Sequence, residues 1–505
     1  MSRPGTLTWL ASHELRLGWR DWLSLMTAGR RRRVRTVAIA LSVFGVFMHL
    51  IAYGMVVRYA DAQPDLPNLV TVSGLLLLSF SLLLSQAMES VTRAFYARSD
   101  LDLILTSPVS PQKVFAVRIA RIAGAVATMA MLIAAPFVDM LALTGGARWL
   151  CAYGVVGVMG AVAASIGVAL TVALFRTIGP RRTRFVAQVL AAVIGAAFLI
   201  GLQVVAILSF GSLSRLAPLH SPWLLAHVPA ADSALWWPAR AALGDSSALG
   251  WLVLFALTLL GVTIMLFSPR FGDHAIAASG VSQTVVRQRQ RGFRLRSPKQ
   301  TLRRKEWTLL ARDPWLMSQT LMQILYLLPP ALLLWRSFRD GTTALIVLVP
   351  VIVMAAGQLS GGLAWLSISG EDAPDLVATA PIAARSLLWA KIEAVMIAIA
   401  VIFAPLVLAL AVASSWAAAV CAVGVMIAAA SATDIQLCFR VQARRSQFRR
   451  RQTSSRVATF AEAFSSISWA AAAALVAAGT WFALVPAVAA VAILGGVRLI
   501  APPRD

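Results

Sequence analysis

The chain has 505 residues, of which 59% are hydrophobic and only 13% are charged, and its mean hydropathy is +0.78. Soluble globular proteins are about 45–50% apolar and about 25% charged, so this composition excludes an ordinary soluble enzyme and indicates an integral membrane protein. Lys and Arg number 45 against 21 Asp and Glu, a formal net charge of +24 that suits either a nucleic-acid-binding surface or the cytoplasmic loops of a membrane protein.

Before the first long apolar run, one helical face is apolar while Glu14, Arg16 and Arg20 fall elsewhere on the helix. This pattern predicts an amphipathic helix that lies at the membrane interface, with lipid as its partner. The apolar face consists of Leu15, Trp19, Trp22, Leu23 and Met26.

Apolar runs of about 20 residues, long enough to cross a bilayer, occur twelve times. The sequence therefore predicts an all-α, polytopic membrane protein with about 12 transmembrane helices. The predicted spans are residues 36–57, 69–88, 122–143, 149–175, 185–210, 249–268, 316–335, 343–367, 392–411, 413–437, 457–478 and 480–497.

The positions of the basic residues decide between the two interpretations of the charge. If the N-terminus is cytoplasmic, 39 of the 45 Lys and Arg fall in cytoplasmic segments. Because positive charge collects in cytoplasmic loops, this bias predicts cytoplasmic N- and C-termini and no nucleic-acid partner. No small-residue cleavage pattern follows the first apolar run, so the first helix is expected to be a retained anchor.

Ionisable residues inside spans are costly and are candidates for a transport path. His49 and Asp139 lie within predicted spans and are the two candidates, whereas Glu393, Asp434 and Glu462 fall near cytoplasmic ends, where we expect water to reach them. The cysteines Cys151, Cys421 and Cys438 lie in or at the ends of spans without metal-like spacing, so neither a disulfide nor a metal site is expected.

The longest external segment, residues 211–250, contains Trp223, Trp236 and Trp237 together with His220 and His227. Its aromatic content favours an interfacial or re-entrant helix with belt residues over a metal or carbohydrate site. The second part of the chain has no counterpart, and the sequence leaves the role of this segment open.

Sequence landmarks recur in the same order in two parts of the chain, which predicts two pseudo-symmetric six-span halves. The predicted domains are a first half with its amphipathic helix (1–268), a basic cytoplasmic linker (269–304) and a second half (305–505). The aligned residues are Glu14 with Glu306, Arg20 with Arg312, Asp21 with Asp313, Asp102 with Asp375, Thr106 with Thr379, Pro108 with Pro381, Arg118 with Lys391, Pro136 with Pro405 and Cys151 with Cys421.

Two of these landmarks, "DLDLILTSPVSPQKVFAVR" and "EDAPDLVATAPIAARSLLWAK", are short cytoplasmic connections. In each, acidic residues precede an apolar turn, and a proline ends one helix before Ser110 or small residues begin the next. Such a segment can dock on a partner, although acid at a helix start and proline at its end also need none. The candidate docking residues are Asp100, Asp102, Leu103, Thr106 and Pro108, and Glu371, Asp372, Asp375, Thr379 and Pro381.

These motifs resemble the permease subunits of bacterial ABC transporters of the exporter class (type 2), in which an elbow helix precedes the first span and coupling helices dock on the ATPase. The resemblance implies a multi-pass protein of the bacterial inner (cytoplasmic) membrane that forms the translocation pathway and works with a separate ABC ATPase, in two copies, which binds ATP and Mg²⁺. Many members have one six-span permease that dimerises, so two fused halves are implied here and further dimerisation stays open.

The chain itself is expected not to be an enzyme and to hold no cofactor or metal. It contains no G-x-x-x-x-G-K-[ST] motif, since none of its four lysines follows a glycine. The sequence LSGG at 359–362 matches a motif of ABC ATPases but lies in an apolar span, where small residues serve helix packing.

Two other functions compete with this hypothesis. One is a secondary transporter of twelve spans driven by an ion gradient, which would use Asp139. The other is a membrane enzyme that acts on lipids, which the five scattered histidines do not support. The sequence determines neither the substrate nor the direction of transport.

Overall fold

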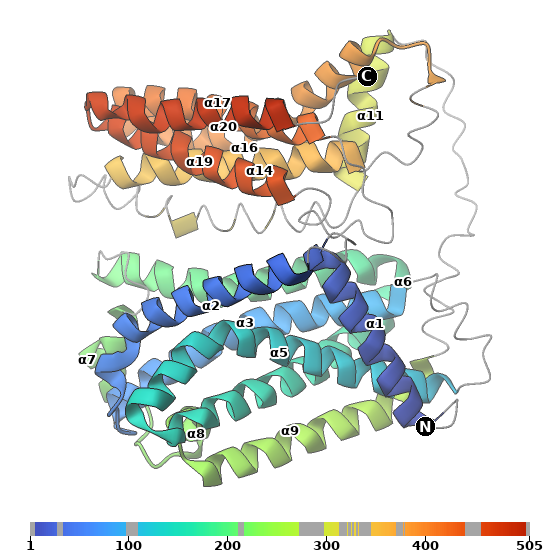
Figure 1. Cartoon of the computed structure of the whole chain (residues 1–505), viewed down its shortest axis with the longest axis vertical. Coiled ribbons are helices and arrows are strands. Elements are labelled where there is room, and N and C mark those ends of the chain that lie inside the picture. Colours follow the sequence, from blue (N-terminus) through green and yellow to red (C-terminus); the bar gives the residue numbers. More distant parts are fainter. Residues whose placement is uncertain are drawn as a thin grey trace. The chain divides into compact units, whose positions relative to one another are not determined.

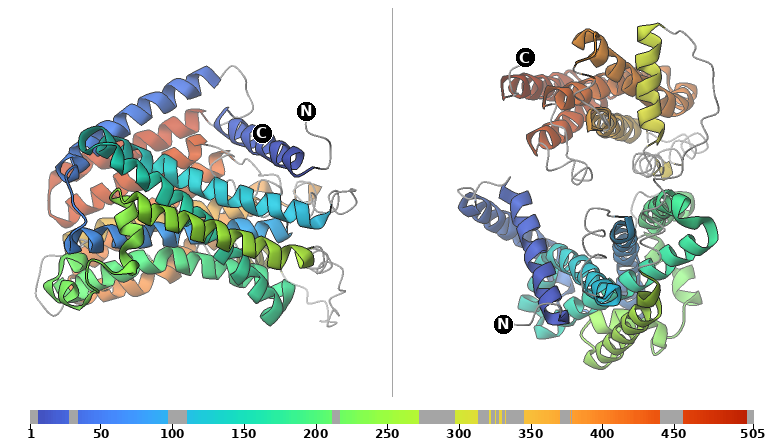
Figure 2. Two further views of the ribbon diagram at one scale, coloured as in Figure 1. Left: turned by 90° about the horizontal axis from the view of Figure 1, so that it is seen from below. Right: turned by 90° about the vertical axis from the view of Figure 1, so that its right-hand side faces the viewer.

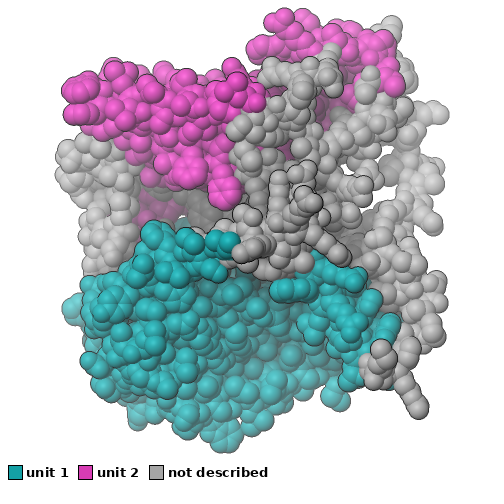
Figure 3. Space-filling view, viewed as in Figure 1, with its two compact units in different colours: residues 1–202, 214–287 teal, residues 203–213, 288–505 magenta. Residues whose placement is uncertain are grey.

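The computed structural model describes residues 6–27, 34–96, 110–210, 217–271, 297–312, 345–369, 379–439 and 456–500, with Val377 and a few single residues between 321 and 332. Within these ranges all regular elements are helices, as the composition predicts. The chain divides into two compact units, Met1–Leu202 with Ser214–Arg287 (unit 1) and Gln203–Leu213 with Gln288–Asp505 (unit 2), which are coloured in Figure 3.

The first part of the chain contains six long helices (Figure 1). They are α1 (Leu7–Thr27), α2 (Val34–Val56), α3 (Leu66–Tyr96), α5 (Pro111–Gly145), α6 (Cys151–Phe210) and α9 (Ser246–Phe267). Short helices connect them, namely η2 (Val57–Tyr59), η3 (Ala147–Leu150), η4 (Ala217–His220), α7 (Pro222–His227), η5 (Ala234–Trp236), α8 (Trp237–Ala242) and η6 (Ser268–Arg270).

Unit 2 contains the helices of the later part of the chain. They are α11 (Pro298–Arg312), α14 (Leu345–Ser369), α16 (Ala384–Ala413), α17 (Ser415–Phe439), α19 (Arg456–Ala477), η8 (Trp481–Ala483) and α20 (Leu484–Ile500). Within each unit one polar helix runs across the long apolar ones: α1 in unit 1 and α11 in unit 2 (Figures 1 and 2).

Ten helical segments of the described chain are long and apolar enough to cross a membrane, and they coincide with ten of the twelve predicted spans. The first predicted span is covered by α2, and the seventh, 316–335, lies outside the described residues except for single positions. The chain is therefore an all-α, multi-pass membrane protein. The relation between the two predicted halves stays a prediction.

Two predicted spans are joined inside α6 by a kink at Gly179, in place of the loop expected at 176–184. Gly179 has φ +75° and ψ 164°, a conformation that residues with a Cβ rarely adopt. Pro180 follows in the first turn of the next span, where its missing N–H leaves no hydrogen bond unmade. The Thr183 hydroxyl donates to the Gly179 carbonyl oxygen at 2.8 Å and secures this turn.

Residues 217–245, in the segment predicted to be external, form a small cap of short helices and not the single interfacial or re-entrant helix that the aromatic content suggests. Trp236 is buried against Leu69, Trp149 and Leu219, and its ring nitrogen donates to the Ala230 carbonyl at 3.1 Å. Trp223 remains 69% exposed, as a belt residue would be. The tryptophans therefore have different roles, one in packing and one at the surface.

Small residues of α14 allow a close approach of α19 in unit 2. A Cβ on Gly361 would lie 2.1 Å from Cδ of Glu462, and one on Gly357 would lie 2.3 Å from Oγ of Ser466. The LSGG sequence thus serves helix packing, as predicted. Glu462 is only 4% exposed and accepts a hydrogen bond from the Gln436 amide, so the expectation that water reaches it was wrong. Its depth follows from the adjacent glycine, which leaves room for the carboxylate between the helices.

Candidate functional site

In unit 2, Glu306 on the crossing helix α11 is the most deeply placed charged residue of the candidate site. Ser297 begins α11, because its hydroxyl accepts from the Gln300 backbone N–H at 3.3 Å and Pro298 occupies the first turn. One face of the helix then carries Leu302, 7% exposed, and Glu306, 0% exposed. The helix thus brings a carboxylate to the base of the helix bundle.

Lys391 on α16 neutralises this carboxylate. Its Nζ lies 3.1 Å from Oε1 and 3.2 Å from Oε2 of Glu306, and it also donates to the carbonyl oxygen of Ser367 near the end of α14. The Lys391 side chain is 10% exposed, and Lys305 lies 3.4 Å from the same carboxylate. A buried charge is tolerated only when it is paired and hydrogen-bonded, so these residues act as a unit. We call Glu306, Lys391 and the Ser367 carbonyl the unit 2 clasp.

A second ion pair joins the same two helices at the surface of unit 2. Arg303 of α11 lies 2.6 Å from Oε1 of Glu393 on α16, and its side chain is 55% exposed. Exposed pairs contribute little to stability because water and salt screen them.

In unit 1, the residue aligned with Glu306 occupies a comparable place. Glu14 of α1 lies 3.2 Å from Nε of Arg121 on α5, with side-chain exposures of 18% for Glu14 and 41% for Arg121. Arg118, aligned with Lys391, is 7% exposed on the same helix. Both crossing helices therefore hold a glutamate against a cation of the helix that follows a predicted docking segment.

The docking segments themselves fall mostly outside the described residues. This applies to Asp100, Asp102, Leu103, Thr106 and Pro108 and to Glu371, Asp372 and Asp375. The structure describes where the following helices begin: Ser110 precedes α5, and Ala383 precedes α16. Thr379 and Pro381 are exposed, and Pro381 lies in a bend just before α16, where the sequence predicts a break.

Buried aromatic rings join the two ends of the first docking segment. Phe95 near the end of α3 and Phe115 in the first turns of α5 have ring centroids 6.3 Å apart. Phe271 lies 5.4 Å from Phe95 and 5.1 Å from Phe115. Tilted aromatic pairs at these distances are attractive. Apolar packing thus contributes to holding the base of the first segment, and an ion pair contributes to holding the base of the second.

The two ionisable residues predicted for a transport path, His49 and Asp139, contact each other in unit 1. Nε2 of His49 on α2 lies 3.2 Å from Oδ2 of Asp139 on α5, and Nδ1 lies 2.7 Å from the Gly45 carbonyl oxygen. The Tyr153 hydroxyl of α6 donates to Oδ1 of Asp139 at 2.7 Å. Three spans thus converge on one carboxylate, which satisfies a costly charge within the membrane.

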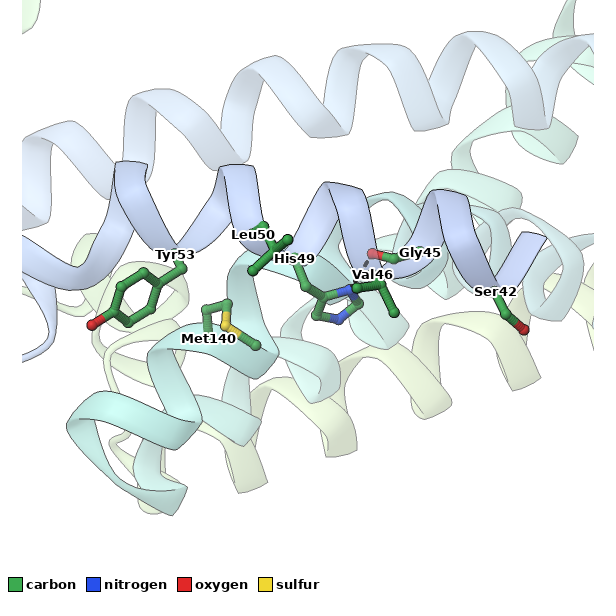
Figure 4. Close-up of a pocket in the computed structure, with 7 residues that line it drawn as sticks. All are labelled: Ser42, Gly45, Val46, His49, Leu50, Tyr53 and Met140. Atoms are coloured by element: carbon green, nitrogen blue, oxygen red, sulfur yellow. Dashed lines mark hydrogen bonds between the residues drawn. The ribbon is translucent and has the colours of Figure 1, made fainter. Parts of the chain in front are cut away.

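Next to this network lies a largely apolar cavity of about 610 Å³ (Figure 4). The cavity is open, and it is lined by one face of α2 together with Met140 of α5. Cavities of about 300–1,000 Å³ accommodate small organic ligands. The lining residues are Ser42, Gly45, Val46, His49, Leu50, Tyr53 and Met140.

Sequence reasoning identified His49 and Asp139 separately but missed Tyr153. A tyrosine near a predicted helix start is ordinarily a belt residue, and only the packing of α6 against α5 reveals it as a donor. No group of three or more His, Cys, Asp or Glu that could bind a metal occurs in the part of the chain that the structure describes.

Comparison with protein families relates the chain to a family of transporters. A family model described as "Putative ABC exporter" matches residues 35–315, which is more than half of the 505 residues. The matched region begins at α2 and ends just after α11. No curated protein and no solved structure matches the chain.

Proposed function

Because the chain belongs to the ABC exporter family, we propose that it is the transmembrane permease of an ATP-driven exporter. In this proposal it forms the translocation pathway in the bacterial inner membrane, with both termini in the cytoplasm. The observation that carries the proposal is the family match over 35–315, and the ten apolar helices agree with it. Family membership does not favour the alternative of an ion-gradient-driven carrier.

ATP hydrolysis belongs in this proposal to a separate ABC ATPase, present in two copies and loaded with ATP and Mg²⁺. The chain has no phosphate-binding loop of its own. Its docking sites are the acidic segments around Asp100–Pro108 and Glu371–Pro381, the exceptions on a strongly basic cytoplasmic side. ATP-driven closure of the ATPase dimer would displace these segments and the spans attached to them as rigid bodies.

The network of His49, Asp139 and Tyr153 is the proposed polar element of the transport path. The cavity beside it is lined almost entirely by apolar groups. We therefore expect an apolar or amphipathic substrate rather than an inorganic ion.

Charge reversal of the docking segments tests the proposal. The chain carrying both Asp102→Arg and Asp375→Arg should lose co-purification of an ABC ATPase that the wild-type chain retains. Asp232→Arg, an exposed acid of the external cap, is the matched control and should leave co-purification intact. Unchanged binding and ATP hydrolysis in the double variant would refute the assignment.

A further inference from the structure

We infer that Lys391 is a positioning residue that holds the crossing helix α11 and both ends of the second docking segment together, so that they move as one rigid body. The inference rests on the proposed function, because it explains how displacement of that segment by an ATPase reaches the rest of unit 2. It concerns residues that do not themselves dock.

The position of Lys391 in the chain supports this role. The segment 370–383 leaves from α14, which ends at Ser369, and returns through α16, which begins at Ala384. Lys391 lies two turns into α16 and contacts the Ser367 carbonyl in the last turn of α14. One side chain therefore connects α14 and α16, the two helices that flank the docking segment.

The same ammonium group also holds α11. Glu306 offers two carboxylate oxygens and Ser367 one carbonyl oxygen, which provides an acceptor for each of the three N–H bonds of a lysine. Since Glu306 is fully buried, a shift of α11 away from α16 would separate this carboxylate from Lys391 in a low-dielectric environment, which is costly. The clasp thus resists relative motion of all three helices.

Unit 1 offers an internal comparison. Its aligned glutamate, Glu14, is partly exposed and pairs with the 41% exposed Arg121, while the ends of its docking segment are packed by phenylalanines. A buried ion pair therefore joins the helices around the second docking segment, and apolar packing contributes to joining those around the first. Arg118, at the position that the sequence aligns with Lys391, is also buried.

The test uses the full-length chain in complex with its ATPase, with the three native cysteines replaced by alanine. Nitroxide labels on Gln300→Cys of α11 and Val401→Cys of α16, both exposed positions, report the distance between the helices. With the native clasp, the distance distribution should be the same without nucleotide and with ATP and vanadate. The key variant combines Glu306→Gln with Lys391→Met, because removal of both charges leaves neither Glu306 nor Lys391 as a buried ion without the other.

In this double variant we expect the distance distribution to broaden and to change with nucleotide. ATPase co-purification should stay within about twofold of wild type. Stimulation of ATP hydrolysis by the permease should fall by about tenfold, which corresponds to a loss of about 1.4 kcal/mol of coupling free energy. Lys391→Arg should retain the native behaviour. Arg303→Gln, which breaks the exposed pair between the same two helices, should do so as well.

A double variant with native distances and native stimulation would overturn the inference, as would an Arg303→Gln chain that behaves like the double variant. If the wild-type chain recruits no ABC ATPase, the proposed function itself fails. The label distances of the chain alone then still show whether the clasp holds α11, so the two failures can be distinguished.

Discussion

Asp139 accepts hydrogen bonds within the membrane from a tyrosine and contacts a histidine, and these partners can be removed one at a time. Tyr153→Phe deletes the hydroxyl that donates to Oδ1 and leaves His49 in place. A hydrogen bond to a charged group contributes about 1.5–3 kcal/mol, so the variant should unfold more easily by about that amount. Thermal unfolding in detergent measures the difference.

Tyr53→Phe is the matched control for this change. The hydroxyl of Tyr53 has no hydrogen-bond partner among the described residues, and the side chain is 49% exposed on the wall of the cavity. Its removal should leave the unfolding midpoint unchanged. Equal losses in the two variants would show that the Tyr153 hydroxyl does not stabilise Asp139.

Asp245 provides a pH-dependent contribution outside the membrane. The Ser247 hydroxyl and the Ala248 backbone N–H donate to its carboxylate at the start of α9, and they hold the pKa of Asp245 below its ordinary value of 3.8. A lowered folded-state pKa means that the stabilisation is complete above the unfolded pKa and is lost as pH falls through the folded one.

The wild-type chain should therefore lose this contribution only below about pH 3.8, whereas Asp245→Asn, which still caps the helix, should show no such pH-dependent loss. Asp245→Ala should be less stable by about 1 kcal/mol at neutral pH. Unfolding midpoints of the three chains between pH 6 and pH 3 make the comparison. An Asn variant with the same acid-dependent loss as wild type would contradict the prediction.

Single residues were predictable from the sequence where their chemistry conflicts with their surroundings. Asp139 and His49 are conspicuous because ionisable groups are costly in apolar spans. Their pairing was not predictable, because they are 90 positions apart and only the packing of α2 on α5 joins them. The burial of Glu462 was also not predictable. Its position near a helix end indicated contact with water, and only the glycines of α14, which are distant in sequence, allow it to be buried.

At the scale of elements, the two crossing helices should differ in how strongly their glutamates anchor them. Glu306→Gln removes the Glu306 carboxylate from the buried Lys391, and breaking a buried ion pair in this way costs about 3–5 kcal/mol. Glu14→Gln breaks a partly exposed pair with Arg121, for which about 0–1 kcal/mol is expected. Hydrogen exchange should therefore accelerate strongly in α11 and only slightly in α1. Equal acceleration in both helices would show that burial does not decide the strength of the anchor.

The kink in α6 gives a second prediction at this scale. Gly179→Ala adds a Cβ in a conformation with φ +75° and ψ 164°, which only glycine adopts readily. No neighbouring atom lies within 4 Å of that Cβ, so the cost is backbone strain alone. We expect a loss of about 1–3 kcal/mol in unfolding free energy. Gly201→Ala, in the same long helix and equally unobstructed, is the control and should be neutral or stabilising.

Long apolar helices were predictable because twenty apolar residues in a row have few alternatives to a span. The connections between the helices were less predictable from the sequence. The four arginines of residues 176–184 predict a loop, yet the two helices meet at a kink at one glycine, with little interruption of helical structure. The short helices of the external cap escaped prediction because six-residue helices derive their stability from tertiary packing, here around Trp236, and not from local periodicity.

For the whole molecule, the family match and the contacts within each unit cover different parts of the chain. The match extends over 35–315, so α14 to α20 lie outside it. Unit 2 nevertheless contains a crossing helix whose glutamate meets a cation of the helix after a docking segment, as unit 1 does. The duplicated six-span unit that the sequence predicts would account for this correspondence, because aligned residues of a repeat occupy equivalent places.

The duplicated arrangement requires both crossing helices to lie on the cytoplasmic side, which a labelling experiment can test. Gln300→Cys in α11 and Asp232→Cys in the external cap are exposed positions on predicted opposite sides. Intact cells with a permeabilised outer membrane should react with a membrane-impermeant maleimide at position 232 and not at 300, while disrupted membranes should react at both. The unmodified chain is the control, since Cys421 and Cys438 are buried and Cys151 is partly buried. Basic residues on one side fix the orientation of all spans together. Labelling of position 300 in intact cells would therefore show that the topology is the opposite of the predicted one. Both docking segments would then lie on the side where ATP is not available.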